Sequence, residues 1–496
     1  MNFLGVSLRN HDANISLSVG KKVKYIKFER EFNQKHFGCI DYYFIKYVLD
    51  KWNINVSDIN AVAYVTDMSF LNLPHYSDNL VEELKPKDWF LDQFKCPFFK
   101  IDHHFAHVLS TWPLEEKSDI DFVLDGVGDF EKTYSIFKNK KLIKSFSLDD
   151  AESLGRMLGV LAPCNNISGH PLDLSGKVMG LKSYGKINPE FCNLFKDDIT
   201  EIKKLFSDRK YFTLNTKEEK TQLNRLASIH HKCENIILNF FKKNANSKNH
   251  ISFSGGVAQN SVINGILKKE FSNLIIPPHC PDDGLSLGLI EFLRQNYNQE
   301  PFENKDFPYW QDDCSPINFP SDETINQTAE FLAKGKIVGW YQGHGEIGPR
   351  ALGNRSILMN PTIKNGKDIL NNKVKKRESF RPFGATILQE QVSNYFNFKG
   401  KSEYMLFVSE ILEKEKFSSI THVDNTCRIQ TLNFKNNTFY HTLLNKFYNL
   451  TGIPMLLNTS LNINSFPICS KPFHAMQIFQ NTELDVLVIG NELYKK

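Results

Sequence analysis

Short runs of strand-forming residues, set between longer helix-like segments, constrain the fold of this chain more than any other feature. The first two runs, 3–8 and 13–19, are joined by the polar turn Arg9-Asn10-His11-Asp12, and a third run covers 23–28. A hairpin with a polar first turn suits a sheet whose turns face a ligand. Further runs alternate along the chain, with strand-like segments at 61–65, 122–124 and 250–253 and helix-like segments at 42–51 and 223–241. This alternation predicts an α/β or mixed α+β fold.

The length and one change of composition predict two domains. The chain has 496 residues, more than a single hydrophobic core usually organises. Between residues 295 and 322 the sequence is rich in Asn, Asp, Glu and Pro, and beyond it a helix-like segment leads into a strand-like run at 336–341. We therefore expect a first domain at 1–300, a linker at 301–322 and a second domain at 323–496, without an internal sequence repeat.

The composition is that of an ordinary folded protein. The net charge of +4, from 60 basic and 56 acidic residues, is too small and too evenly spread to indicate nucleic-acid binding or a membrane surface. The nine cysteines form no C-x-x-C pair, so we expect reduced thiols. Charge appears too early for a signal peptide, and no run approaches the roughly 18 to 20 apolar residues that span a bilayer. These features predict a cytoplasmic protein without membrane insertion.

The segment Asp102-His103-His104-Phe105-Ala106-His107 is the first strong indication of a metal site. In a helix, His103 and His107 lie one turn apart on the same face, while His104 lies roughly 100° round the helix and suits a supporting or capping role. Two ligands do not complete a site, and ordinary core or surface histidines explain this motif equally well when it is taken alone.

Two aspartates are candidates to complete the site. Asp125 ends an apolar run and precedes the turn Gly126-Val127-Gly128, and Asp282 opens a second glycine-containing segment. Either residue taken singly is more often structural. Together with His103 and His107, they form a set of two imidazoles and two carboxylates that suits iron(II), manganese or zinc.

A second glycine turn, Ser254 to Asn260, follows the strand-like run at 250–253. Its glycines allow the backbone to approach a ribose or phosphate, and Asn260 has an amide that can read a hydroxyl. Coming after the turn at Asp125, it indicates a nucleotide site.

The second domain concentrates basic residues beside glycine and proline. The set consists of Arg350, Arg355, Lys375, Lys376, Arg377, Arg381 and Arg428. Guanidinium groups pair bidentately with phosphates, and lysine adds a point charge. Asn458-Thr459-Ser460 follows the apolar run 454–457 and offers short polar groups to phosphate oxygens. Any one of these arginines alone is best explained as a solvated ion pair, but the set indicates a phosphate site.

These motifs occur in an order that resembles the NodU/CmcH/TobZ family of carbamoyltransferases over nearly the whole chain. In the first domain the matching stretches are Asn10-His11-Asp12-Ala13, 102–107, 125–128, 176–181 and 255–260. In the second domain they are 348–356, 377–383, His422-Val423-Asp424 and 457–460.

The resemblance implies an N-terminal domain of the actin-like ATPase/sugar kinase (ASKHA-type) fold and a C-terminal YrdC-like α/β domain. It implies that His11 is the catalytic base and that His103, His107, Asp125 and Asp282 bind iron(II). The residues implied to hold the donor and nucleotide at the transfer site are Lys35, Asp125, Gly126, Gly155, Lys177, Gly256 and Asn260. Those implied to bind ATP, with Mg²⁺, and carbamoyl phosphate at the activation site are Arg350, Lys375, Arg381, Arg428, Asn458 and Ser460.

The resemblance also implies a reaction. Carbamoyl phosphate, directly or after hydrolysis to carbamate, attacks ATP in the second domain to give carbamoyl-AMP and pyrophosphate. The first domain then passes the carbamoyl group to a hydroxyl of a sugar, natural product or protein side chain. A homodimer is compatible with this scheme. The sequence departs from the family pattern at Asn10, Leu174-Ser175, Leu461 and Asn464-Ser465-Phe466, which affects loop shape and acceptor identity and removes none of the proposed ligands.

Three other functions are alternatives to an O-carbamoyltransferase. A carbamoyltransferase acting on a thiol, as in hydrogenase maturation, carries C-x-x-C zinc fingers, which this sequence lacks. The tRNA-modifying relative is disfavoured because no basic patch is evident. A non-catalytic ATP-binding regulator of the actin-like fold explains the glycine turns but neither the paired histidines nor the arginines.

Overall fold

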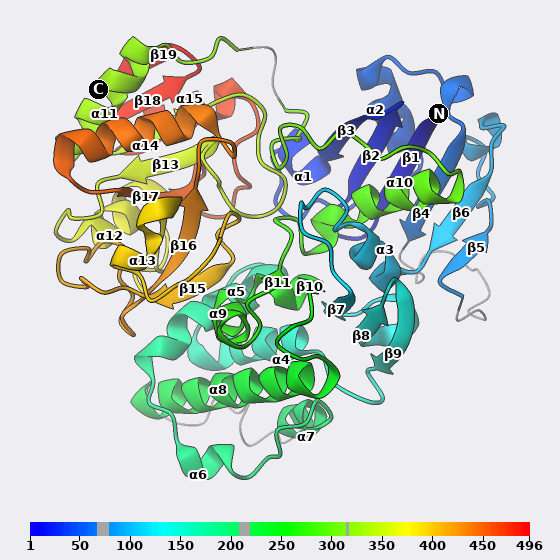
Figure 1. Cartoon of the computed structure of the whole chain (residues 1–496), viewed down its shortest axis with the longest axis horizontal. Coiled ribbons are helices and arrows are strands. Elements are labelled where there is room, and N and C mark those ends of the chain that lie inside the picture. Colours follow the sequence, from blue (N-terminus) through cyan, green and yellow to red (C-terminus); the bar gives the residue numbers. More distant parts are fainter. Residues whose placement is uncertain (67–78, 208–218, 314–316) are drawn as a thin grey trace.

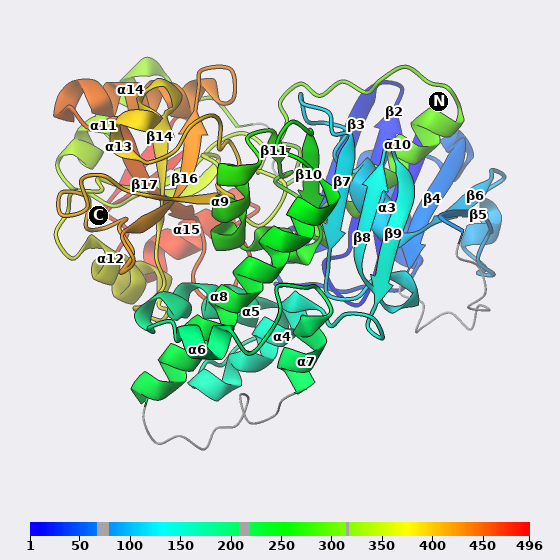
Figure 2. The same cartoon turned by 60° about the horizontal axis from the view of Figure 1, so that its bottom comes forward.

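The computed structural model describes residues 1–66, 79–207, 219–313 and 317–496. The chain forms three lobes (Figure 1): one around the N-terminal sheet, one containing the long helices of the middle of the chain, and one made by the C-terminal residues. Turning the molecule shows that the second sheet stands beside the first (Figure 2).

The first sheet begins with the predicted hairpins. β1 (Asn2–Leu8), β2 (Asn14–Val19) and β3 (Lys22–Lys27) pair antiparallel, and β4 (Ala61–Thr66) runs parallel to β1. Next to β4 lie β6 (Phe98–Ile101) and then β5 (Val81–Glu83), which gives the order β3-β2-β1-β4-β6-β5.

Helices bury both faces of this sheet because side chains alternate along each strand. Leu4, Val6 and Leu8 pack with α2 (Tyr43–Trp52) on one face. Phe3 packs on the other face with α10 (Leu285–Asn296), which returns from nearly 300 residues further along the chain. The opening strands are therefore tied to the loop that begins at Asp282.

The second sheet repeats the plan of the first. β7 (Ile120–Leu124), β8 (Lys132–Lys138) and β9 (Lys141–Ser147) form an antiparallel meander, and β10 (Ile251–Ser254) and β11 (Leu274–Ile275) continue parallel to β7. The order β9-β8-β7-β10-β11 matches β3-β2-β1-β4-β6. The sequence contains no repeat, yet the topology is duplicated, as in the actin-like ATPase/sugar kinase fold.

Helices packed around the second sheet form the middle lobe. Among them are α4 (Leu154–Leu161), α5 (Pro171–Leu181), α6 (Pro189–Cys192), α7 (Glu201–Ser207), α8 (Glu219–Asn244) and α9 (Ser261–Glu270).

The C-terminal residues form an eight-stranded mixed sheet in the order β15-β16-β14-β17-β13-β12-β18-β19. Its strands are β12 (Val338–Tyr341), β13 (Arg355–Met359), β14 (Gly384–Leu388), β15 (Phe407–Glu410), β16 (Thr426–Leu432), β17 (Met455–Ser460), β18 (Val486–Ile489) and β19 (Glu492–Lys495). α11 (Asp322–Ala333), α14 (Thr438–Thr451) and α15 (Pro472–Asn481) contribute buried residues to the same core. The fold class predicted from the sequence, an actin-like domain followed by a second α/β domain, is confirmed.

The segment proposed as a linker is ordered where the structure describes it. Gln311 bridges Tyr25 of β3 on one side and Gly345 of the C-terminal part on the other. Cys314, Ser315 and Pro316 lie outside the described residues. β17 extends through Ser460, beyond the predicted run, because Thr459 and Ser460 pair with Ile357 and Ser356 of β13.

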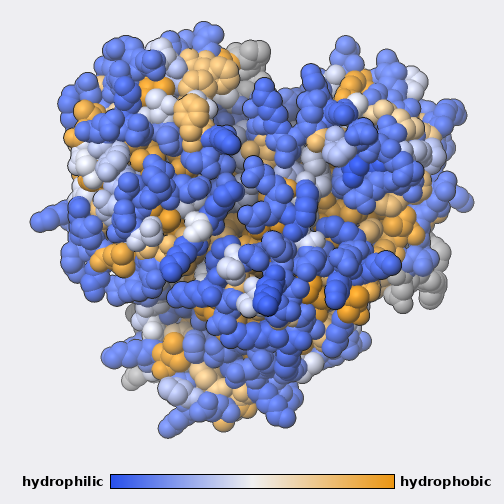
Figure 3. Space-filling view, viewed as in Figure 1, coloured by the Kyte–Doolittle hydropathy of each residue, from blue (hydrophilic) through white to orange (hydrophobic). Residues whose placement is uncertain are grey.

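Two predictions about the surface and the thiols can be compared with the structure. In the described parts of the chain, no helix has the length and apolar character needed to cross a membrane. Hydrophilic side chains cover most of the face shown in Figure 3, with apolar residues in scattered groups. The eight cysteines among the described residues are all free.

Candidate active site

The paired histidines lie on a short buried helix. α3 (His103–Leu109) begins after the N-cap Asp102, whose side chain accepts a hydrogen bond from the Phe105 amide. The four-residue spacing puts His103 and His107 on one face, and both rings are fully buried. Their Nε2 atoms lie 3.1 Å apart. Both rings therefore present a ligand atom to the same point.

Asp125 and Asp282 complete a four-donor cluster. The Nε2 of His103 is 2.8 Å from Asp125 Oδ2 and 3.4 Å from Asp282 Oδ1. The Nε2 of His107 is 3.8 Å and 3.4 Å from the same two oxygens. Ligand atoms about 2.1 Å from one ion lie roughly 3.0–3.5 Å apart. The spacing of the donors, two nitrogens and two oxygens, therefore fits a single divalent ion.

The charges of the cluster also suit a cation. Burial raises the pKa of the Asp282 carboxyl, but Arg9 and His103 outweigh it and hold that pKa well below its usual range. Asp125 is likewise held ionised, with the hydrogen bond from His103 opposing burial. His104 takes no part, since its Nδ1 lies 2.7 Å from the Ser135 hydroxyl.

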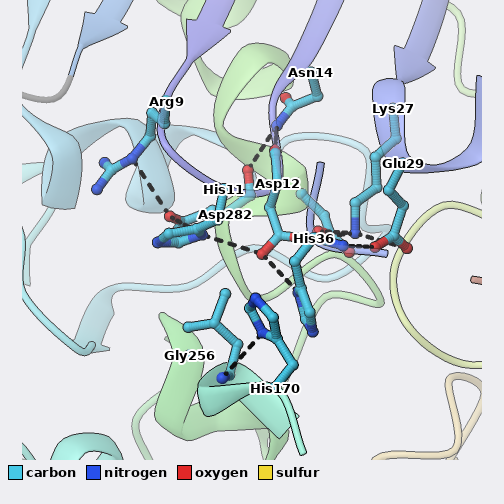
Figure 4. Close-up of polar contacts among 12 residues, drawn as sticks. Arg9, His11, Asp12, Asn14, Lys27, Glu29, His36, His170, Gly256 and Asp282 are labelled. Carbon is cyan, nitrogen blue, oxygen red and sulfur yellow. Dashed lines mark hydrogen bonds and ion pairs between the residues drawn. The ribbon is translucent and has the colours of Figure 1, made fainter. Parts of the chain in front are cut away.

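His11 stands beside this cluster with one ring nitrogen occupied (Figure 4). Its Nδ1 lies 3.1 Å from Asp12 Oδ2 and 3.8 Å from Asp282 Oδ2. The side chain keeps 28% of its surface exposed. The turn predicted from the sequence thus presents a half-buried imidazole whose Nδ1 is fixed by a carboxylate and whose Nε2 is left for a substrate.

Asp12 is held by two further groups. Its Oδ1 is 3.0 Å from the Lys27 ammonium, and its Oδ2 is 3.5 Å from His36 Nδ1. The backbone of Asp12 has φ of 52°, a left-handed conformation that non-glycine residues rarely adopt. Such a conformation persists only where surrounding contacts fix it.

Lys27 forms a buried charge centre that the sequence reasoning missed. Its ammonium lies 3.2 Å from Glu29 and 2.6 Å from Asp283, in addition to its contact with Asp12. Asp12, Glu29 and His36 have the donor spacing of a second metal site, but the lysine ammonium already supplies the cation. The one indication of this centre in the sequence is the set of charged residues that interrupts an apolar run at 27–31.

Lys35 lies at the mouth of the site. Its ammonium pairs with Asp173 of α5, and its side chain is 30% exposed. His36 Nε2 is 3.3 Å from the same carboxylate, and the His36 ring stacks on His170 at 4.6 Å between centroids. The structure therefore brings Lys35 close to His11, through Asp173, His36 and Asp12.

Most of the expected nucleotide residues gather around Asp125. The Gly256 amide donates to Asp125 Oδ1 at 2.8 Å, and the Ser153 hydroxyl, which caps α4 just before Gly155, donates to the Asp125 carbonyl. A side chain at Gly126 would meet nothing within 4 Å, so the space beside it is open.

Two residues from that list make protein contacts instead. The Asn260 side chain caps α9 and its amide nitrogen lies 3.1 Å from His230 Nε2. The Lys177 ammonium lies 2.5 Å from Glu378 of the C-terminal domain.

Five of the predicted C-terminal cations form one array: the half-buried Arg350, Arg377, Arg381 and Arg428 and the buried Lys375. Among the described residues the array has one carboxylate partner, Glu378, at 3.7 Å from Arg381. Arg355 instead pairs with the buried Asp313 at 3.1 Å. Burial, together with Arg350 and Arg381, holds the pKa of Arg428 well below its ordinary value. Burial together with Arg377 and Arg381 does the same for Lys375, whose ammonium bonds only to neutral oxygens of Ser460 and Asn462.

Several donors of this array are unsatisfied. Among the described residues, the buried Nε atoms of Arg350 and Arg428 have no hydrogen-bond partner. Arg350 reaches only the Gln259 carbonyl, at 3.4 Å. Asn458 is engaged within the sheet, with Thr386 and Gln430. Guanidinium groups that are partly removed from water without gaining counter-ions are costly, so the array suits a polyanion.

The two sites define a two-part protein, with an actin-like domain that carries a metal-type donor cluster and an α/β domain that carries an array of cations. Models of the carbamoyltransferase N-terminus and C-terminus match residues 76–289 and 329–496. The chain belongs to the carbamoyltransferase family and is an enzyme of that class. This membership favours the enzyme over the non-catalytic regulator.

Three relatives and one solved structure are similar to this chain. Nodulation protein NolNO of Sinorhizobium fredii is 28% identical over 98% of this chain and 79% of its own length. Nodulation protein NolO of Bradyrhizobium diazoefficiens is 30% identical over 80% and 79%. The 3'-hydroxymethylcephem-O-carbamoyltransferase of Streptomyces clavuligerus is 30% identical over 46% and 44%. Component A of (R)-2-hydroxyglutaryl-CoA dehydratase from Acidaminococcus fermentans superposes with a TM-score of 0.37 at 12% identity, covering 60% of this chain and 100% of that one.

Proposed function

We propose that this chain is an ATP-dependent O-carbamoyltransferase that works in two steps at two sites. At the C-terminal array, hydrolysis of carbamoyl phosphate gives carbamate and inorganic phosphate, and the carbamate then displaces pyrophosphate from the α-phosphate of ATP to form carbamoyl-AMP. The N-terminal site then moves the carbamoyl group from AMP to an acceptor hydroxyl. The observation that carries the proposal is the presence of two chemically different centres in one carbamoyltransferase chain. One is an array of cations that outnumber their carboxylate partners, and the other is a histidine beside a donor cluster.

The cation array meets the needs of the first step. The triphosphate and the carbamate that attacks it are both anions, so their approach requires fixed positive charge. Arg350, Arg381 and Arg428 supply that charge at a small cost in broken ion pairs, because the one carboxylate beside them among the described residues is Glu378, at 3.7 Å from Arg381. Mg²⁺ would accompany ATP at this site.

The second step is supported by the arrangement around His11. Because Asp12 occupies Nδ1, Nε2 is the ring atom available to accept the proton of the acceptor hydroxyl. Burial lowers the pKa of His11, but Asp12 and Asp282 outweigh burial and raise that pKa above the ordinary imidazole value, which makes the ring a stronger base. The open space beside Gly126 leaves room for the nucleotide next to Asp125.

His103, His107, Asp125 and Asp282 would hold an ion in the transfer site. We propose iron(II), with manganese and zinc as the alternatives that this ligand set allows. When bound, the ion supplies Lewis-acid polarisation of the carbamoyl donor.

The acceptor is proposed to be a hydroxyl of a sugar, a natural product or a protein side chain. Because the His11 side chain is partly exposed, a hydroxyl on a large molecule can reach it. A panel of such molecules, incubated with ATP and carbamoyl phosphate, should contain one that gains 43 daltons, the mass of a carbamoyl group replacing hydrogen.

The decisive experiment separates the two steps. In a single turnover, His11→Asn should release pyrophosphate at the wild-type rate, and only when carbamoyl phosphate is present. In the presence of the acceptor, the variant should release AMP at least about 10²-fold more slowly than the wild type, which is the usual contribution of a general base. Loss of pyrophosphate release in this variant would contradict the proposed division of labour. Pyrophosphate release by the wild type without carbamoyl phosphate would contradict the proposed donor.

A further inference from the structure

Helix α5 connects the two sites along one of its faces. Asp173, Lys177 and Gly180 are spaced by four and three residues, so they lie on the same side of the helix. From Asp173 to Gly180 the helix rises by roughly 10 Å. Figures 1 and 2 both place α5 at the boundary between the middle lobe and the C-terminal lobe.

The first end of this face contacts the transfer site. The Asp173 carboxylate pairs with Lys35 and lies 3.3 Å from His36 Nε2. His36 in turn reaches Asp12, the residue that fixes the His11 ring. A shift of Asp173 would therefore change the surroundings of the catalytic histidine.

The other end is fastened to the C-terminal domain. Gly180 has no side chain, and a Cβ there would already be 3.4 Å from Pro382, so this turn lies directly against the loop that carries Arg381. The Gly180 carbonyl accepts a hydrogen bond of 2.9 Å from His422 Nε2. Just beyond the helix, the Ser183 hydroxyl donates to Asp424 at 2.6 Å. These contacts give the segment His422-Val423-Asp424 a structural role that the nucleotide site does not explain.

Between the two ends of this face, Lys177 forms an ion pair with Glu378 of the C-terminal domain. Its side chain is 8% exposed, and its ammonium lies 2.5 Å from Glu378 Oε1. Glu378 stands between Arg377 and Arg381 in the sequence, and its other oxygen is 3.7 Å from Arg381. Within the described parts of the chain, Glu378 is the one carboxylate that pairs with a cation of the array. Glu378 is therefore the protein's own negative charge at a site that we propose binds phosphates.

We propose that α5 couples the activation site to the transfer site, with Lys177–Glu378 as the responding contact and Asp173 as the positioning residue at the far end. The inference rests on the proposed function. Phosphates that bind to the array repel the Glu378 carboxylate and replace it as the partner of Arg381. The ion pair between Glu378 and Lys177 changes as a result. Because the helix is rigid, the change reaches Asp173, and through it Lys35 and His36. A ligand shifts such an equilibrium only through contacts that differ between the two states, and the carboxylate displaced by phosphate is such a contact.

Hydrogen exchange of the full-length protein tests the coupling without an acceptor. The probe is α,β-methylene-ATP with Mg²⁺, which cannot be cleaved at the bond that adenylation breaks. We expect the probe to change amide exchange in the α5 peptide of the wild type by about fivefold or more. In Glu378→Gln that change should be largely lost, while calorimetry shows the probe binding with a Kd within threefold of wild type or tighter.

A matched control uses the same substitution at another ion pair. Glu483 pairs with Lys373 at 2.8 Å on the surface of the C-terminal domain, where both side chains are more than half exposed. Glu483→Gln should leave the α5 response intact. The reversed pair Lys177→Glu with Glu378→Lys should recover part of it, which a merely structural role for either residue does not predict.

The outcomes separate this inference from the proposed function. Binding of the probe to the wild type without a change in α5, or an equal change in Glu378→Gln, would overturn the coupling and leave the function standing. Failure of the wild type to bind the probe would overturn both.

Discussion

At the scale of single residues, the Asp12 carboxylate determines which nitrogen of His11 faces the substrate. It holds the ring at Nδ1, and Lys27 and His36 hold the carboxylate in turn. Asp12→Asn is a sharp test because asparagine tolerates the left-handed backbone at this position. The amide loses the charge that stabilises the protonated ring. We expect AMP release in a single turnover to slow by about 10²- to 10⁴-fold. Pyrophosphate release should not change, and an equal loss of both would show that Asp12 supports the fold instead.

His36 makes the stability of this corner depend on pH. Burial lowers the pKa of His36, but hydrogen bonds to Asp12 and Asp173 outweigh it and raise the pKa to about 9. A histidine whose folded pKa lies above its unfolded value of about 6.5 stabilises the fold fully below pH 6.5, and this contribution is lost as pH rises to about 9. The wild type should therefore exceed His36→Gln in free energy of unfolding by up to about 3 kcal/mol at pH 6. Urea titrations at pH 6 and 9.5 should show that advantage disappearing, and a constant difference would contradict the assignment.

At the scale of elements, the metal-type cluster depends on how closely α10 approaches α3. Gly288 of α10 touches α3 so closely that a Cβ there would be 2.1 Å from the Ala106 carbonyl oxygen. Ala106 precedes His107, so a side chain at 288 would displace the helix that carries both histidines. We expect Gly288→Ala to lower the free energy of unfolding by about 1–3 kcal/mol, the usual cost of overpacking. The purified variant should also retain less transition metal when measured by plasma mass spectrometry.

A second helical glycine provides the control for this prediction. A Cβ at Gly176 in α5 would meet nothing within 4 Å. Gly176→Ala should be neutral or stabilise the protein by up to about 1 kcal/mol, because alanine is the better helix former. Equal destabilisation by both substitutions would mean that the contact with α3 is not the cause.

Elements of this kind were predictable wherever the information is local. Apolar runs gave β1 to β4 and α2 to within about two residues, and the four-residue spacing gave the shared face of His103 and His107. The duplicated sheet topology was not predictable, because strand order depends on pairing between distant segments. The Lys27 centre was missed for the same reason, since Asp283 joins it from more than 250 residues away. The engagement of Lys177 by Glu378 equally required both domains.

At the scale of the whole molecule, the two domains meet at a glycine beside the cation array. Gly348 has φ of 86°, and a Cβ on it would be 2.1 Å from the Pro278 carbonyl oxygen, four residues before Asp282. The fully buried Arg30 donates to the Gly348 carbonyl at 2.7 Å. This joint fixes Arg350 against the glycine turn of the first domain, so it sets the distance between the two sites.

Gly348→Ala should therefore impair carbamoyl transfer more than carbamoyl-AMP formation, with both domains still folded. The clash moves the loop away from Pro278, so we expect AMP release in a single turnover to fall by at least about tenfold, the effect of roughly 1.4 kcal/mol on a barrier. Pyrophosphate release should fall less, because the array lies within one domain, and small-angle scattering should show a larger radius of gyration. Gly400→Ala is the matched control, since Gly400 has φ of 91° and nothing within 4 Å of a Cβ. It carries the same backbone strain without the clash, so if it reproduced the loss of AMP release, strain and not the contact between domains would be responsible.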